Sequence, residues 1–145
     1  MEQTNRARVH PTVLLIDDCV SQRDLYEIAL QPEFNIVTAT RGGDGLAIAA
    51  SKRPDAIVLD VMMPGMDGWE TCTRLKCDCA TESIPVILLT AANDLELSDH
   101  ARAVGASAIL EKPCTGDRLR DAVLAALAES VPAAPLPFQS SRSTA

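Results

Sequence analysis

Five short runs of apolar, often β-branched residues recur along the chain, and a stretch with helical periodicity separates each run from the next. Because these runs are apolar throughout rather than alternating with polar residues, they predict strands covered on both faces. Strands that alternate with helices through right-handed crossovers predict an α/β fold, with one doubly wound, five-stranded parallel sheet and helices on both faces. The runs are TVLLI at 12–16, FNIVTA at 34–39, AIVLDV at 56–61, IPVILLT at 84–90 and SAILE at 107–111.

Three of the helical stretches carry apolar residues at i, i+3 or i+4 spacing, which is typical of a helix that packs one stripe on a core. These stripes are Leu25, Ile28 and Ala29; Leu46, Ala49 and Ala50; and Leu119, Val123, Ala126 and Leu127. After about Ser130 the sequence changes to VPAAPLPFQSSRSTA, whose prolines oppose regular structure. We therefore expect a flexible segment at 1–11, one domain at 12–130 and a tail or truncated linker at 131–145.

The composition fits one folded domain, because 47% of the 145 residues are hydrophobic and the mean hydropathy is +0.08. The formal net charge of -7 argues against direct binding to nucleic acid, since no basic face is available for phosphates, and favours cations instead. No apolar run approaches the roughly 18 residues that a membrane helix needs, so we expect a cytoplasmic protein without a membrane partner.

The five cysteines are an odd number and lie in helical or strand-like sequence, which favours reduced thiols over a disulfide framework. Three of them, Cys72, Cys77 and Cys79, lie close enough in sequence to suggest zinc. Their spacing is not a CxxC pair and no histidine accompanies them, so incidental thiols are the preferred interpretation.

The strand predicted at 12–16 is followed directly by two carboxylates, Asp17 and Asp18, although burying charged groups without partners is costly. One interpretation is that Asp18 caps the next helix while Asp17 lies in solvent. A parallel sheet offers another, because it gathers the residues that end its strands along one edge. There the two carboxylates would meet Asp60 from the third strand, Thr90 from the fourth and Lys112 after the fifth.

Three close carboxylates repel one another unless a hard dication holds them, and oxygen ligands alone favour Mg²⁺. Such a site could accept a phosphoryl group on one carboxylate, with the metal, the lysine and the hydroxyl stabilising its oxygens. Asp60 is the best candidate nucleophile, because it stands alone on the middle strand and leads into the loop MMPGMDG.

Four motifs in order, VLLIDD, LDVMMPGMDG, ILLTA and EKP, resemble the receiver domain of bacterial two-component response regulators over about Val13 to Ala128. The resemblance implies a flavodoxin-like sheet with strand order 2-1-3-4-5. It makes Asp60 the phosphoacceptor and makes Thr90 and Lys112 the pair that binds the phosphoryl group. The Mg²⁺ ligands that it implies are Asp17, Asp18, Asp60 and the backbone carbonyl of Met62.

Four further positions at or beside these motifs bear on how the signal is read out and how long it lasts. The family commonly has tyrosine or phenylalanine three residues before the lysine, where this chain has Ile109, so we expect the readout of the signal to differ. Pro113 is expected to follow a cis peptide bond that aims the lysine. In the family, the positions of Met62 and Ala92 flank the approach of hydrolytic water, and neither side chain can orient a water here. We therefore expect slow self-dephosphorylation.

The sequence thus predicts phosphorelay signalling, in which a sensor histidine kinase or histidine phosphotransfer protein phosphorylates Asp60 and thereby alters partner binding. The chain would catalyse its own phosphorylation and dephosphorylation rather than act as an enzyme, and a downstream effector would contact the last two helices. An alternative is the N-terminal receiver of a longer regulator with a DNA-binding or enzymatic output domain. A haloacid-dehalogenase-like phosphatase would need a second aspartate where Met62 stands, and a flavin carrier would share only the fold.

Overall fold

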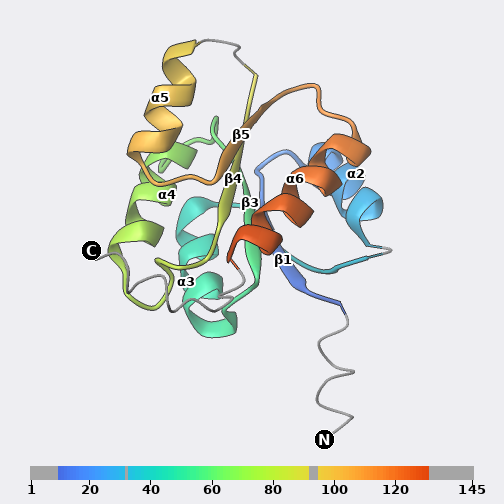
Figure 1. Ribbon diagram of the computed structural model, residues 1–145, viewed down its shortest axis with the longest axis horizontal. Helices are drawn as coiled ribbons and strands as arrows, with labels where there is room; N and C mark the ends of the chain where they lie inside the picture. The colour runs from blue at the N-terminus through green and yellow to red at the C-terminus, as the bar shows by residue number, and fades with distance from the viewer. Residues whose placement is uncertain (1–9, 32, 92–94, 131–145) are drawn as a thin grey trace, which may run out of the picture.

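Strands and helices alternate along the chain in the computed structural model, which describes residues 10–31, 33–91 and 95–130 (Figure 1). The strands are β1 (Thr12–Ile16), β2 (Asn35–Ala39), β3 (Ala56–Asp60), β4 (Val86–Thr90) and β5 (Ala108–Glu111). The helices are α2 (Val20–Leu30), α3 (Gly42–Lys52), α4 (Gly68–Cys77), α5 (Leu95–Ala103) and α6 (Gly116–Ser130). Most of the expected N-terminal segment and all of the expected tail lie outside the described residues, so the domain limits stay a prediction.

The described strands form one parallel sheet in the order β2-β1-β3-β4-β5. This order confirms the predicted doubly wound, flavodoxin-like architecture. Strands β3 and β4 are buried at every residue, whereas the edge strands β2 and β5 are partly exposed. The expectation that the apolar runs are covered on both faces therefore holds in the middle of the sheet and weakens at its edges, where a strand has a neighbour on one side only.

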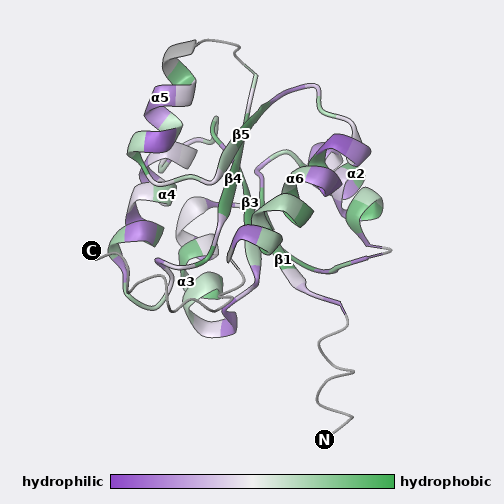
Figure 2. Cartoon of the chain, in the orientation of Figure 1, coloured by the Kyte–Doolittle hydropathy of each residue, from purple (hydrophilic) through white to green (hydrophobic). Residues whose placement is uncertain are grey.

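The core is divided into two layers because side chains alternate between the two faces of each strand. Leu14 and Ile16 of β1 face the layer shared with α3, α4 and α5, whereas Val13 and Leu15 face the layer shared with α2 and α6. Figure 1 shows these two sets of helices on opposite sides of the sheet, and Figure 2 shows hydrophobic strands between helices that carry many hydrophilic residues. Of the helices that the structure describes, none is long and apolar enough to cross a membrane.

The stripe predicted on α2 is wrong, because Leu25 and Ile28 are 62% and 68% exposed. The helix instead buries Tyr26 and Leu30, which lie four residues apart and join the layer that α2 shares with α6. Apolar residues occupy more than one side of this helix, so their spacing alone does not identify the side that meets the sheet. Packing of the large Tyr26 and Leu30 side chains decides it.

The other two predicted stripes agree better with the structure. On α6 the whole stripe is buried or packs on the core: Leu119, Val123, Ala126 and Leu127. On α3, Ala49 is fully buried and Leu46 packs against the core, but Ala50 is exposed. Ala50 therefore lies outside the part of the helix surface that packs on the core.

The cysteines are all free, as the odd number and the surrounding sequence predicted. Cys72 is buried, whereas Cys77 and Cys79 are exposed. The residues that the structure describes contain one group of three or more potential metal ligands, and these cysteines are not part of it.

Candidate functional site at the carboxyl edge of the sheet

The residues predicted to converge do end neighbouring strands at one edge of the sheet. Asp17 follows β1 and Asp60 ends β3, next to each other in the strand order. Thr90 ends β4, and the amide of Lys112, just after β5, donates to the carbonyl oxygen of Thr90 at 2.7 Å. The parallel direction of the strands therefore gathers two carboxylates, a hydroxyl and an ammonium at one edge.

Three carboxylates form a compact acidic cluster, since one oxygen from each of Asp17, Asp18 and Asp60 lies within 4.8 Å of the others. Asp17 is 0% and Asp60 3% exposed, while Asp18 is partly exposed. The Oδ1 atom of Asp17 accepts a hydrogen bond from the Cys19 amide at 2.9 Å. Its Oδ2 atom is buried without a hydrogen-bond partner in the part of the chain that the structure describes.

The alternative in which Asp18 caps the helix and Asp17 lies in solvent is therefore wrong. Helix α2 begins at Val20, and its N-cap residue is Cys19, which makes no capping hydrogen bond through its side chain. Asp17 is buried at the end of β1 because its backbone amide continues the sheet, donating to the carbonyl oxygen of Ala39 at 3.1 Å.

Burial in the protein disfavours the ionised forms of the two buried carboxylates, Asp17 and Asp60. Burial raises the pKa of Asp17, and the charges of Asp60 and Asp18 raise it further, against the Cys19 amide and Lys112, which lower it. Burial also raises the pKa of Asp60, while its contact with Lys112 and a hydrogen bond from the Met62 amide oppose that effect. The cluster is thus short of positive charge.

Lys112 supplies part of that charge. Its Nζ atom lies 2.7 Å from the Oδ1 atom of Asp60, and the lysine side chain is only 14% exposed. Burial acts to lower the pKa of Lys112, but its contact with Asp60 and the charges of Asp60 and Asp17 outweigh burial, so the pKa is raised. The peptide bond between Lys112 and Pro113 is cis, which confirms that expectation.

A polar contact that the sequence did not reveal holds the same lysine from the other side. The Nζ atom of Lys112 donates to the Oε1 atom of Gln22, on α2, at 2.6 Å. The neighbouring Arg23 donates from Nη1 to the carbonyl oxygen of Asp17 at 2.8 Å. Nothing in the local sequence marks either residue, because a polar residue on a helix is ordinarily solvated.

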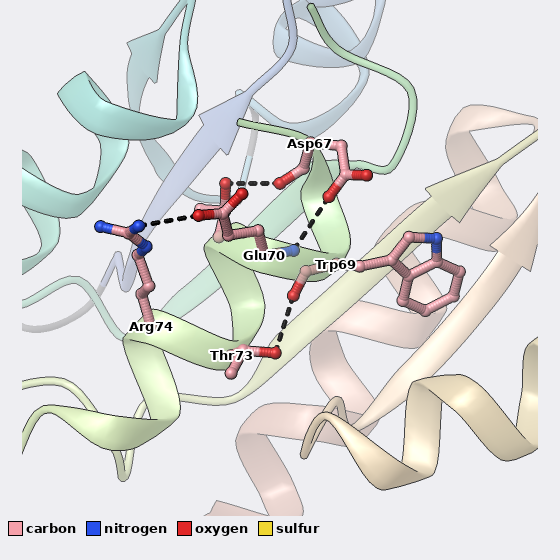
Figure 3. A network of polar contacts seen from close by, with 6 residues as sticks. Asp67, Trp69, Glu70, Thr73 and Arg74 are labelled. Atoms are coloured by element: carbon pink, nitrogen blue, oxygen red, sulfur yellow. Dashed lines mark hydrogen bonds and ion pairs between the residues drawn. The ribbon is translucent and has the colours of Figure 1, made fainter. Parts of the chain in front are cut away.

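The loop after Asp60 is fixed by the start of helix α4. A Cβ atom on Gly68 would lie 2.5 Å from the carbonyl oxygen of Asp60, so only glycine allows this approach. The Asp67 side chain accepts the Glu70 amide at 2.9 Å and caps the helix, and Arg74 pairs with Glu70 at 2.7 Å (Figure 3). This network anchors the far end of the loop that carries Met62, whose side chain is 69% exposed.

Two other sequence candidates are Ile109, which lies on β5, and Ala92; the aromatic Trp69 is not one of them. Ile109 is half-buried on β5 and lines a pocket of about 220 Å³ beside α5. Trp69, whose ring points away from the polar network in Figure 3, stacks on His100 of α5 with ring centroids 3.9 Å apart. Ala92 lies outside the residues that the structure describes.

Comparison with known proteins defines the class to which this fold and site belong. The profile of the response regulator receiver domain matches residues 13–124. The chain therefore belongs to the response regulator receiver family, and its role is in phosphorelay signal transduction. This membership decides against the phosphatase and flavin-carrier alternatives.

Similar proteins include both longer regulators and proteins of about one domain. The chain is 46% identical to the transcriptional regulatory protein AfsQ1 of Streptomyces coelicolor, over 58% of this chain and 36% of that protein. It is 43% identical to the response regulator PleD of Caulobacter vibrioides, over 70% of this chain and 22% of that protein. The solved structure of the Vibrio cholerae chemotaxis protein CheY4 is 30% identical, covers 81% of this chain and 98% of its own, and superposes with a TM-score of 0.77.

Proposed function

We propose that this receiver domain accepts a phosphoryl group on Asp60 from a phosphohistidine of a sensor histidine kinase or a histidine phosphotransfer protein. Receiver domains interact with such donors as a class. The observation that most supports the proposal is the contact of buried Asp60 with Lys112 inside a cluster of three carboxylates.

The transfer needs one nucleophile and groups that bind the phosphoryl oxygens. A carboxylate oxygen of Asp60 attacks phosphorus as the bond between phosphorus and the donor's histidine nitrogen breaks. The electron pair of that bond stays on the imidazole nitrogen, and Asp60 becomes an acyl phosphate. The Lys112 ammonium, 2.7 Å from Asp60, and the hydroxyl of Thr90 on the next strand would stabilise the phosphoryl oxygens.

The residues at this edge also fit Mg²⁺. Receiver domains bind this ion as a class, and the carboxylates of Asp17, Asp18 and Asp60 offer oxygen ligands close together, with Asp17 Oδ2 lacking a hydrogen bond among the described residues. We propose that these three side chains and the carbonyl of Met62 hold the ion. When bound, Mg²⁺ supplies positive charge to the carboxylates and the phosphoryl oxygens. The chain would act on itself, as acceptor, rather than turn over an external substrate.

The output is proposed to be a change in affinity for a downstream effector that contacts helices α5 and α6. Two arrangements fit the lengths of similar proteins. The chain covers 97% of the protein PilH of Pseudomonas aeruginosa, at 31% identity, but only about a third of AfsQ1. A stand-alone receiver and an N-terminal receiver of a longer regulator are both compatible with this, and reading the gene beyond the codon for residue 145 separates them.

Intact-mass measurement tests the acceptor directly. Incubation with a small acyl phosphate and Mg²⁺ should add one phosphoryl group to the wild type and none to an Asp60→Asn variant. An Asp121→Asn variant, which changes an exposed carboxylate on α6, is the matched control and should be phosphorylated like the wild type. A phosphoryl group gained by Asp60→Asn would move the acceptor to another residue.

A further inference from the structure

Gln22 contacts the lysine of the candidate site from helix α2. Its Oε1 atom accepts a hydrogen bond of 2.6 Å from Lys112 Nζ, across 90 positions of the sequence. The same Nζ atom lies 2.7 Å from Asp60 Oδ1. The ammonium therefore lies between a charged acceptor and a neutral one.

The position of Gln22 is itself fixed, because helix α2 is joined to the end of β1. The Cys19 amide donates to Asp17 Oδ1 at 2.9 Å, and Arg23 donates to the Asp17 carbonyl oxygen at 2.8 Å. Gln22 lies between these two contacts in sequence and is partly buried. Its amide is thus presented from a rigid element rather than from a loop.

The chemistry of a lysine explains why such a contact matters. A lysine side chain has four flexible bonds and loses much rotamer freedom when its ammonium is held in one place. An ammonium has three N–H donors and the hydrogen bond to Gln22 uses one of them, so donors remain for an oxygen of an incoming phosphoryl group. A neutral amide holds the ammonium without adding a fourth negative charge beside the three carboxylates.

We propose that Gln22 is a positioning residue for phosphoryl transfer, which holds the Lys112 ammonium beside Asp60 before the donor arrives. This inference rests on the proposed function and adds a residue outside the motifs that carry the resemblance. Because Gln22 acts through Lys112, removing its acceptor slows transfer only while the lysine is present.

A double-mutant cycle tests this dependence. The initial rate of Asp60 phosphorylation is measured against the concentration of a small acyl phosphate, at saturating Mg²⁺, for the wild type, Gln22→Met, Lys112→Ala and the double variant. Methionine keeps the length of the side chain and removes the acceptor. We expect Gln22→Met to lower the maximal rate roughly fivefold to tenfold in the wild-type background and to have no further effect in Lys112→Ala.

Gln31→Met is the matched control, because Gln31 is an exposed glutamine just after the same helix. It should keep the wild-type rate. An unchanged rate in Gln22→Met, or an equal fold loss with and without Lys112, overturns the inference. A wild type that gains no phosphoryl group contradicts the proposed function instead, so the two failures are distinguishable.

The NMR signal of the Lys112 ammonium gives a second readout that a change in overall stability would not move. A hydrogen-bonded ammonium exchanges its protons with water slowly, so the signal should be visible in the wild type and lost in Gln22→Met. Gln22→Glu keeps an acceptor at this position and should retain the signal. Loss of the signal in Gln22→Glu, or its persistence in Gln22→Met, overturns the inference.

Discussion

The two halves of the carboxyl edge differ in how well their charged groups are satisfied. The lysine half, at the ends of β4 and β5, gives Lys112 two close acceptors, Asp60 at 2.7 Å and Gln22 at 2.6 Å. Among the described residues, the acidic half, at the ends of β1 and β3, leaves Asp17 Oδ2 and Asp60 Oδ1 buried without a hydrogen bond, although Asp60 Oδ1 lies within ion-pair distance of Lys112. Lys112 thus has two close acceptors, while Asp17 Oδ2 has no donor among the described residues.

This difference bears on the proposed metal site. Oxygen atoms of three clustered carboxylates are the ligands that a hard dication prefers, and such an ion satisfies several of them at once. A second lysine would bring a long, flexible side chain into a place where the central strands are already buried at every residue. This contrast supports the proposal that the acidic half holds a metal ion and that the lysine half binds phosphoryl oxygens.

The largest expected effect comes from removing the charge of Asp17. An Asp17→Asn variant loses a ligand charge, so we expect Mg²⁺ binding to weaken on the order of tenfold or more, as measured by calorimetric titration. Without metal, the same variant should be more stable than the wild type by about 1 kcal/mol in denaturant unfolding, because one buried charge disappears. The asparagine oxygen can still accept the Cys19 amide, so the local fold is kept.

Asp24→Asn is the control for this comparison, since Asp24 is an exposed carboxylate on α2. It should leave both Mg²⁺ affinity and stability close to the wild type. Wild-type Mg²⁺ affinity in Asp17→Asn would show that the unsatisfied oxygen is not a ligand, and the contrast between the two halves would lose its explanation.

The acidic cluster and its lysine could be predicted because they follow from chain direction. Asp17, Asp60 and Lys112 each lie at or just beyond the end of an apolar run, and parallel strands bring such positions together whatever the loops do. The cis bond before Pro113 was expected only from the resemblance, since local sequence does not fix the isomer.

Contacts between helices could not be predicted in the same way. Gln22 reaches Lys112, and Trp69 stacks on His100, through the relative rotation of helices, which no local pattern encodes. The same limit explains the error on α2, where Leu25 and Ile28 have helical spacing but face outward. A periodic pattern shows that a helix has an apolar side; when apolar residues occupy several sides, packing selects among them.

The pH dependence of metal-free stability gives a smaller effect that sharpens the comparison. Burial raises the pKa values of Asp17 and Asp60 in the folded protein. In the unfolded chain these carboxyl groups ionise at about pH 4. Between that pH and the raised pKa values, the folded state therefore binds more protons than the unfolded state does. Their contribution to stability therefore falls as pH rises through this window. The pKa of Lys112 is raised, so its contribution is lost only in the alkaline range.

Other carboxylates also titrate in this window, so the measurement is the difference in unfolding free energy between Asp17→Asn and the wild type. We expect that difference to grow in favour of the variant between about pH 4 and pH 7, by on the order of 1 kcal/mol. Saturating Mg²⁺ should reverse its sign at pH 7, because the metal stabilises the protein that binds it more tightly by the larger amount. A difference that stays constant with pH would mean that Asp17 titrates normally despite its burial.

The smallest expected effect concerns the lifetime of the proposed phosphorylated state, for which the resemblance points to the positions of Met62 and Ala92. Met62 lies two residues after Asp60, and Ala92 lies two residues after Thr90. Neither side chain can orient a water molecule for attack on the acyl phosphate, and an attacking water that is poorly oriented loses much of the benefit of proximity. Self-dephosphorylation of the wild type should therefore be slow.

A double variant, Met62→Asn with Ala92→Glu, introduces one polar group on each side and should lose a phosphoryl label a few-fold faster than the wild type. Because the Met62 side chain is 69% exposed, the Asn substitution should leave folding intact, and thermal unfolding checks this. The two single variants show which half matters more. Each single variant should accelerate the loss of label by less than the double variant does, because each introduces only one of the two polar groups. Equal rates in the wild type and the double variant would show that these positions do not set the lifetime.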